Sequence, residues 1–384
     1  MNIIYLDYAA TTPPDNRVLE IMGKVSRENF GNPSSVHQYG QQAEAELERA
    51  RRSMAEDLGC SPREVIFTSC GTESDNLALR GAALAAREER GADQLLIAPL
   101  EHHAVLHTAE QLEELFGFEV VYLPVDQYGV THPDQVRKLL SSRTALVSVM
   151  YANNEIGSYN PIQEIGLVCQ EAGVPLHTDA VQAGAHRPMD VDTLGVDLLS
   201  LGAHKFYGPK GVGALYVRAD TPLIPVQTGG AQEFGLRAAT ENVPLISGMA
   251  AAYRAVQDHH RERRIQAEQL RDRLIDAVLD QIPEARLTGH PRRRLPNHAS
   301  FAFKDVDSNL LVSMLDARGY AVSSGSACKT GNPEPSRVLE SLGLGPEWTR
   351  GSLRVTVGVE TRLDEIDPFC SLLPELIREV RELS

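Results

Sequence analysis

The chain has 384 residues and 42.0 kDa, with 42% hydrophobic and 23% charged residues, which excludes a mainly disordered protein and is typical of two domains. Its 37 basic and 52 acidic residues give a net charge of −15, whereas general nucleic-acid binders are basic. No apolar run approaches the roughly 18 residues of a membrane helix, and no signal peptide is evident, so we expect a soluble, cytoplasmic protein.

Residues 15–255 alternate between helical and strand-like segments. Helices are predicted at 38–58 and 75–90, with others between most of the strands. Buried strands are predicted at 64–68, 94–98, 119–123, 145–150, 174–178 and 197–201, and an additional, antiparallel strand at 211–217. Short apolar runs that alternate with helices indicate βαβ units, so this part predicts a large α/β domain with a mostly parallel mixed sheet.

The rest of the chain, residues 1–14 and 256–384, predicts a smaller α+β domain. One long helix from about 244 to 281 leads into it. It is followed by an alternating strand at 299–303, a helix at 308–318, a loop that contains Cys328, a strand at 352–357 and a terminal helix.

The five cysteines are widely spaced, odd in number and lack a CxxC pair, which argues against a disulfide framework and against a cysteine-built zinc site. Cys328 stands out because small residues and glycines flank it in SSGSACKTG, at 323–331. Such a loop is expected to be exposed, and Lys329 favours the thiolate. We therefore predict that Cys328 is a reactive thiol.

Polar or ionisable residues follow five of the predicted strands, and ligands of parallel sheets bind beyond the carboxyl ends of the strands. Any one of these groups is more often a helix cap or a satisfied hydrogen bond. Together they favour a binding site. Lys205 is set among small, turn-forming residues, where a desolvated lysine can form a Schiff base. Asp179 could lie beside a pyridine nitrogen, and the helix start at Gly71-Thr72 could bind a phosphate. A Schiff-base lysine, a carboxylate at the pyridine nitrogen and a phosphate site are the arrangement that pyridoxal phosphate uses.

A metal site is the competing use of these side chains. Glu101, His102, His103 and His107 lie close together in the sequence, and the last two have i,i+4 spacing. The zinc-protease order H-E-x-x-H is absent, so the cofactor interpretation is favoured.

Nearly the whole chain resembles the cysteine desulfurases of the NifS/IscS-like type, within the aspartate-aminotransferase-like, fold type I enzymes that use pyridoxal 5'-phosphate. The resemblance rests on ten strings in the family order: YLDYAATTP (5–13), GNPSSVH, GTESDN, EHHAV, NNEIG, HTDAVQ, AHKFYGPKG, GGAQEFGLRAATENV, SSGSAC and LRVTVG (353–358).

The resemblance implies a role for each matching residue. Lys205 resembles the cofactor-binding lysine, Asp179 the partner of the pyridine nitrogen, Gln182 the donor to the phenolic oxygen, and His102 the ring stacked over the cofactor. Further cofactor contacts are implied for Gly71, Thr72, Asn154, His204 and Thr240, and substrate contacts for Asn32, Asn154 and Arg354, the last with the α-carboxylate. Thr240 resembles a residue that reaches the other subunit's phosphate, which implies an obligate homodimer.

The implied reaction converts L-cysteine to L-alanine and leaves a persulfide on Cys328, whose sulfur passes to an iron–sulfur scaffold or another acceptor protein. A selenocysteine lyase or another β-eliminating or transaminating relative is the alternative within this cofactor class. A catalytically silent scaffold or metal-binding partner on the same fold is the alternative outside it. Three positions depart from the family pattern: Gly202 replaces a serine near the phosphate, Ala239 replaces a glycine, and Lys329 replaces a threonine.

Overall fold

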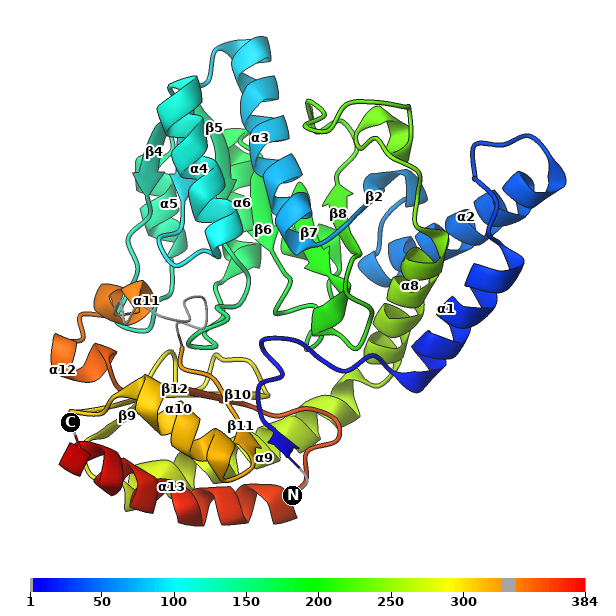
Figure 1. The fold of residues 1–384 in the computed structure, drawn as a ribbon. Helices are drawn as coiled ribbons and strands as arrows, with labels where there is room; N and C mark the ends of the chain where they lie inside the picture. The colour runs from blue at the N-terminus through cyan, green and yellow to red at the C-terminus, as the bar shows by residue number, and fades with distance from the viewer. Residues whose placement is uncertain (1–2, 326–335, 384) are drawn as a thin grey trace.

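The computed structural model describes residues 3–325 and 336–383, and its central feature is a seven-stranded sheet (Figure 1). The strand order is β2-β8-β7-β6-β5-β3-β4. Neighbours from β7 to β4 pair in parallel, and only β8 runs against its two neighbours, β2 and β7. The expected mostly parallel α/β sheet is confirmed. Its strands are β2 (Val65–Thr68), β3 (Gln94–Ile97), β4 (Glu119–Tyr122), β5 (Thr144–Ser148), β6 (Leu176–Asp179), β7 (Leu198–Gly202) and β8 (Gly213–Val217).

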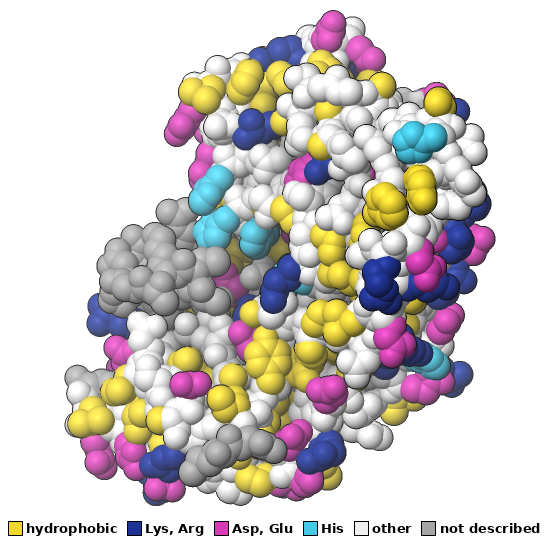
Figure 2. Space-filling view, turned by 45° about the vertical axis from the view of Figure 1, so that its right-hand side comes forward, with side chains coloured by type: hydrophobic (Ala, Val, Ile, Leu, Met, Phe, Trp, Pro, Cys, Tyr) yellow, Lys and Arg dark blue, Asp and Glu magenta, His cyan; other side chains and the backbone are white. Residues whose placement is uncertain are grey.

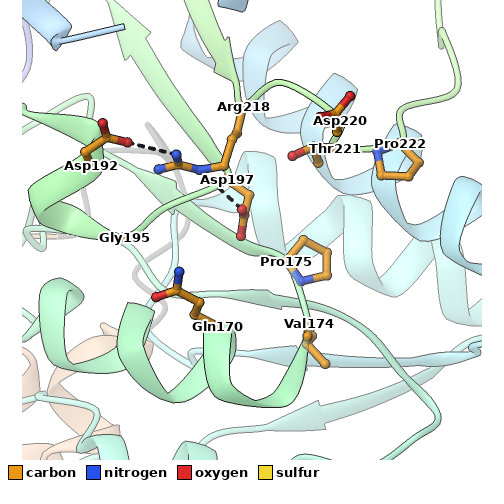
Figure 3. A pocket seen from close by; sticks show the side chains of 11 residues that line it. Gln170, Val174, Pro175, Asp192, Gly195, Asp197, Arg218, Asp220, Thr221 and Pro222 are labelled. Atoms are coloured by element: carbon orange, nitrogen blue, oxygen red, sulfur yellow. Dashed lines mark hydrogen bonds and ion pairs between the residues drawn. The ribbon is translucent and has the colours of Figure 1, made fainter.

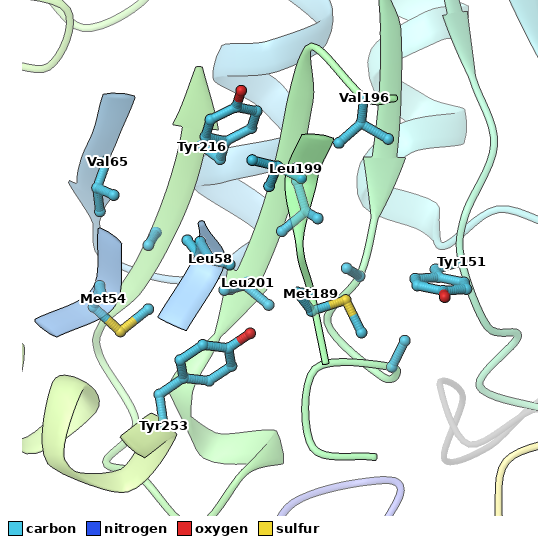
Figure 4. Close-up of a cluster of buried hydrophobic side chains, with 14 of the residues drawn as sticks. Met54, Leu58, Val65, Tyr151, Met189, Val196, Leu199, Leu201, Tyr216 and Tyr253 are labelled. Carbon is cyan, nitrogen blue, oxygen red and sulfur yellow. The ribbon is translucent and has the colours of Figure 1, made fainter. Parts of the chain in front are cut away.

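Helices cover both faces of this sheet, which explains why its strands read as continuous apolar runs. In β3, Leu95 and Ile97 pack under α3 (Gly71–Arg90) and α4 (His103–Phe116). Leu96 points to the opposite cluster, which includes side chains of α2 (Gln38–Leu58), α6 (Ile162–Ala172) and α8 (Val243–Asp258). Figure 4 shows part of that cluster, with Leu199, Tyr216 and Tyr253 among its side chains. The remaining helices here are α1 (Asn16–Glu28), α5 (Pro133–Leu139) and α7 (Val191–Leu194).

A second hydrophobic cluster belongs to the smaller, α+β part of the chain. Its antiparallel sheet has the order β12-β10-β9, and the short β1 (Ile4–Tyr5) pairs in parallel with β11 (Tyr320–Ala321). Leu6 joins this cluster, which supports our proposal that the first residues belong with the smaller domain. The other helices and strands of this smaller part are α9 (His260–Gln281), β9 (Ala285–Leu287), β10 (His298–Phe303), α10 (Ser308–Ala317), α11 (Arg337–Ser341), α12 (Pro346–Thr349), β12 (Ser352–Thr356) and α13 (Leu363–Leu383).

The prediction of one long helix from 244 to 281 is wrong, because the chain forms two helices there. His259 separates them with a non-helical backbone, φ −118° and ψ 15°. The break has a packing reason: α8 packs on α1 and α2, whereas α9 packs on α13. Among the described residues, no helix is both long and apolar enough to cross a membrane.

Candidate active site

The amino-terminal end of α3 lies at the carboxyl edge of the sheet. β2 ends at Thr68, and α3 begins at Gly71, four residues earlier than predicted. A Cβ at position 71 would lie 2.7 Å from Cγ2 of Val181, so only glycine allows the helix to start this close to the loop after β6. Gly202, the last residue of β7, also lies beside the start of α3. A Cβ at position 202 would lie 3.5 Å from the Gly71 amide nitrogen. Free amides at a helix start favour a bound anion, and Thr72 is exposed beside them.

Asp179 is the last residue of β6, and its side chain is buried. Its Oδ1 accepts a hydrogen bond from the Val181 amide at 2.9 Å. Burial raises the pKa of this carboxyl, while the nearby charges of His102 and Lys205 act in the opposite direction. The structure therefore brings these three predicted residues within electrostatic reach of one another.

Lys205 ends a short 3-10 turn, Ala203–Lys205, that directly follows β7. Its Nζ donates to the carbonyl oxygens of Ala9 at 2.6 Å and Ala10 at 2.9 Å. Gln182 donates to the same Ala9 oxygen at 2.8 Å. Neither Ala9 nor Ala10 was among the residues predicted to form the site. Backbone carbonyls leave no side-chain signal, and only the small-residue string YLDYAATTP marks the segment.

His204 packs on the same amino-terminal segment. Its Nδ1 lies 3.2 Å from the hydroxyl of Thr11, and Thr12 donates to its backbone oxygen at 2.9 Å. Burial, followed by the charge of Lys205, lowers the pKa of His204 to about 4. His204 is therefore neutral near pH 7, which limits repulsion next to the lysine amine.

His102 is the N-cap residue of α4, because its Nδ1 accepts a hydrogen bond from the Ala104 amide at 3.1 Å. Burial lowers the pKa of His102, while the charge of Asp179 acts in the opposite direction. Because Nδ1 accepts a hydrogen bond, the neutral form of the ring carries its proton on Nε2. Its ring lies 6.2 Å from that of His103, which lies 4.9 Å from His107. Figure 2 shows histidine side chains gathered at one place on this face. Within residues 3–325 and 336–383, no group of three or more potential ligands is arranged to hold a metal ion.

Arg354 lies in β12 of the smaller sheet and is buried. Its Nη1 donates to the backbone oxygen of Asn154 at 2.9 Å, and its Nη2 pairs with Oδ1 of Asp7 at 2.9 Å. The Nε group is buried without a hydrogen-bond partner, and an unpaired guanidinium donor is a group that a carboxylate can satisfy.

Two predicted residues, Asn32 and Thr240, lie at the surface rather than among these buried groups. Asn32 lies in the exposed loop between α1 and α2, where its Oδ1 accepts from the Ser34 amide at 3.0 Å. Thr240 is exposed as well. Cys328 and its neighbour Lys329 lie outside the described residues.

Two buried carboxyl groups, Asp75 and Glu101, lie close enough to Asp179 for its charge to act on them, and neither was predicted to contact the cofactor. Burial raises the pKa of both well above the ordinary range, and the Asp179 charge adds to the effect. Asp75 Oδ1 lies 3.6 Å from Nε2 of His177, whose pKa burial lowers to about 3. His177 is therefore neutral near pH 7, so this contact is not an ion pair. The sequence offers no signal for Asp75 beyond its place in α3.

A cavity of about 380 Å³ lies at the opposite edge of the sheet (Figure 3). It is lined by residues that precede β6 and β7, such as Pro175 and Asp197, and by Arg218 and Thr221 after the antiparallel β8. This is the amino-terminal edge of the parallel strands, where α/β sheets do not place their ligands, so it is not the candidate site.

The comparisons with known proteins agree with this geometry. The family model for class-V aminotransferases matches residues 4–369. Cysteine desulfurase IscS from Methanosarcina thermophila is 44% identical over 381 residues, 99% of this chain and 93% of that protein. Its counterpart from Dictyoglomus turgidum is also 44% identical, over 99% and 96% of the two chains.

Two solved structures agree closely with the fold. A NifS-like protein superimposes with a TM-score of 0.91 at 35% identity, covering 98% of this chain and all of that one. SspA in complex with cysteine has a TM-score of 0.80 at 33% identity, covering 92% and 98%. The chain therefore belongs to the class-V aminotransferase family of pyridoxal-phosphate enzymes and, within it, to the cysteine desulfurases.

Proposed function

We propose that this protein is a pyridoxal-phosphate-dependent cysteine desulfurase that converts L-cysteine to L-alanine and leaves the sulfur as a persulfide on Cys328. The observation that carries the proposal is the convergence of Lys205, Asp179 and His102 at the carboxyl edge of the sheet, beside the start of α3. This donor set fits a phosphorylated pyridine aldehyde, because it offers an amine, a buried carboxylate and free helix amides.

Each group in the site has a proposed task toward the cofactor. Lys205 would hold the aldehyde carbon, Asp179 the pyridine nitrogen, and Gln182 the phenolic oxygen, with His102 over the ring. Gly71, Thr72 and His204 would line the phosphate end, and Asn154 the substrate side. When bound, the cofactor withdraws electrons from the substrate's α-carbon and so makes its α-proton acidic.

The chain's own residues then carry the proton and sulfur transfers. Lys205 moves the α-proton, while Arg354 pairs with the substrate carboxylate in place of its contacts to Asp7 and Asn154. The Cys328 thiolate attacks the substrate sulfur, so an S–S bond forms as the C–S bond breaks. The carbon skeleton takes up a proton and leaves as L-alanine, and the persulfide sulfur passes to an acceptor protein, for iron–sulfur assembly or other thiolation.

The proposal includes a homodimer. Phe30, Val36 and Tyr39 expose 67%, 91% and 56% of their surface around the loop between α1 and α2, which projects from the body of the molecule (Figure 1). Neighbouring exposed apolar side chains mark an interaction surface. We infer that a second copy covers them and that Asn32 and Thr240 act in the partner's site. A reducing, cytoplasmic setting is part of the proposal, since the chemistry requires a free thiol.

The test is a visible spectrum of the purified protein before and after L-cysteine is added, with L-alanine measured in the same sample. We expect a cofactor band that shifts with L-cysteine, and alanine release. Cys328→Ala should keep the band and lose persulfide formation. Full sulfur release by Cys328→Ala would contradict the nucleophile assignment, and preferential turnover of selenocysteine would favour a selenocysteine lyase.

A further inference from the structure

Two buried side chains converge on one backbone oxygen, that of Asn154 in the loop after β5. Nη1 of Arg354 donates to this oxygen at 2.9 Å, and Nε2 of His298 lies 3.1 Å from it. Both side chains belong to the small sheet, where β10 begins at His298 and pairs with β12, which carries Arg354. His298 is fully buried and Arg354 is 3% exposed. A carbonyl oxygen has two lone pairs, so it can accept both hydrogen bonds at once.

The ring of His298 is a neutral donor. Burial lowers the pKa of His298 well below the ordinary range, and the charges of Arg294 and Arg354 add to this effect. A neutral ring has one N–H group, and the Asn154 oxygen can only accept, so the proton lies on Nε2. Nδ1 is buried without a hydrogen-bond partner. It packs against the bare backbone of Gly157, where a Cβ would lie 2.8 Å away.

A second buried arginine, Arg294, holds His298 against the loop that contains Asn154. Nε of Arg294 donates to the His298 backbone oxygen at 2.9 Å. Its Nη2 donates to the Ile156 backbone oxygen at 3.2 Å, two positions after Asn154. Arg294 therefore fastens the start of β10 to this loop, and the contact between the His298 ring and the Asn154 oxygen is held from both sides.

Arg354, in contrast, has partners that it must exchange when a substrate binds. Its Nη2 pairs with Asp7 at 2.9 Å, and its Nε is buried without a partner. If the guanidinium turns to the substrate carboxylate, as proposed above, the Asn154 oxygen loses the Nη1 hydrogen bond. Within residues 3–325 and 336–383, His298 is then the remaining side-chain donor to that oxygen. A polar group that keeps one hydrogen bond avoids the cost of being left unpaired.

We propose that His298 is a positioning residue for substrate binding, which keeps the Asn154 oxygen hydrogen-bonded and so frees Arg354 for the substrate carboxylate. The proposal rests on the proposed function. His298 acts through Arg354 rather than on the reacting atoms. Without the imidazole donor, the turn of Arg354 toward a substrate leaves the Asn154 oxygen unpaired. The cost falls on the binding of α-carboxylates alone, and amines that lack a carboxylate are unaffected.

The experiment compares two ligands of the cofactor-loaded enzyme, L-alanine and ethylamine, of which ethylamine lacks the α-carboxylate. Shifts of the visible cofactor band give the dissociation constant of each. In His298→Ala we expect the affinity for L-alanine to fall about tenfold, the size of one lost hydrogen bond, and the affinity for ethylamine to stay within about twofold of the wild type. KM for L-cysteine should rise by the same factor as the L-alanine constant, with kcat unchanged.

His298→Gln tests the hydrogen bond itself, because its side-chain amide can donate from the place of Nε2. It should restore most of the affinity for L-alanine. Thr288→Val is the matched control, since it removes a buried hydroxyl that donates to Ser300 of the same strand at 2.8 Å. This variant keeps the His298 and Arg354 side chains, so it should bind both ligands as the wild type does.

Denaturant unfolding of the cofactor-free proteins checks that each variant is folded. His298→Met, which fills more of the space of the ring without a donor, takes the place of His298→Ala if that variant is unfolded. Equal losses of affinity for L-alanine and ethylamine would overturn the proposal, as would wild-type affinity for L-alanine in the variant without a donor. A wild-type cofactor band that responds to neither ligand nor to L-cysteine would instead contradict the proposed function.

Discussion

Lys205 and Gln182 donate to the same oxygen atom, the backbone carbonyl of Ala9, at 2.6 and 2.8 Å. This oxygen brings the amino-terminal segment into the candidate site beside the sheet's carboxyl edge. A charged amine bound to carbonyl oxygens is stabilised as a donor. The carbonyl oxygens of Ala9 and Ala10 therefore hold the Lys205 amine at this edge of the sheet.

The first prediction concerns Lys205 itself. In the cofactor-loaded enzyme, Lys205→Ala should slow the exchange of the α-proton of L-alanine with deuterated water about a hundredfold or more. A positioned acid–base group contributes a rate factor of this size. Lys210→Ala is a matched control in the same stretch, since Lys210 is exposed and follows Lys205 by five positions. It should exchange protons at the wild-type rate. Equal rates of α-proton exchange in the wild type and in Lys205→Ala would show that Lys205 does not move this proton.

The second prediction concerns Gly202. Its backbone, φ −133° and ψ 119°, accepts any residue, and a Cβ there would lie 3.5 Å from the Gly71 amide without a clash. Gly202→Ser should add a donor for the phosphate and tighten cofactor binding by about 1 to 2 kcal/mol, or about 5- to 30-fold.

Fluorescence titration of the cofactor-free protein with pyridoxal phosphate measures this change. Gly202→Ala adds the same Cβ without a hydroxyl and should bind the cofactor as the wild type does. Weaker binding by the serine variant would mean that its hydroxyl does not face the phosphate.

The third prediction concerns Ala239, which has φ +126°, where side chains are strained. Ala239→Gly should raise the free energy of unfolding by up to about 1 kcal/mol, because the relieved strain exceeds the added freedom of glycine in the unfolded chain. Denaturant unfolding measures it. Ala219→Gly, at an exposed position without a positive φ, should lower stability slightly. A loss of stability in both variants would show that position 239 stores no strain.

The fourth prediction concerns His177, which is buried between the hydroxyls of Ser148 at 2.8 Å and Ser200 at 3.0 Å. Its pKa falls from 6.5 in the unfolded chain to about 3 in the fold, because of burial. Between these values the unfolded chain binds the extra proton, so stability is full above pH 6.5 and falls as the pH drops toward 3.

The contribution of His177 is up to about 1.4 kcal/mol per pH unit in this window. Unfolding curves at several pH values measure it. His177→Gln should be less stable near neutral pH, because it loses hydrogen bonds, but its stability should fall less steeply with acid. Parallel pH curves for the two proteins would contradict the prediction.

The fifth prediction separates two roles of His102. The ring caps α4 through Nδ1 and lies near Asp179. His102→Asn keeps a capping oxygen, whereas His102→Ala loses the cap and about 1 kcal/mol of stability. Both variants lack the ring, so both should lose turnover of L-cysteine to a similar degree. If His102→Asn were fully active, the ring would act only as a cap.

The fold class and most of the strand positions could be predicted from the sequence. Apolar runs such as those of β3 and β7 report burial on both faces, which local sequence shows directly. Asp179 and Lys205 could be predicted because each follows a strand, and parallel strands end at one edge. The helix break at His259 could not, because it depends on which distant helices α8 and α9 pack against.

The residues that surround these side chains come from distant parts of the chain, and their identity depends on the three-dimensional packing. The Ala9 carbonyl meets Lys205 across 196 positions, and the pKa of Asp75 is raised by burial and by the charge of Asp179. Glu155 has the sequence context of an ordinary loop residue, and only the fold places the Ser336 hydroxyl against it. Contacts between distant segments depend on how the layers pack, and local periodicity carries no information about them.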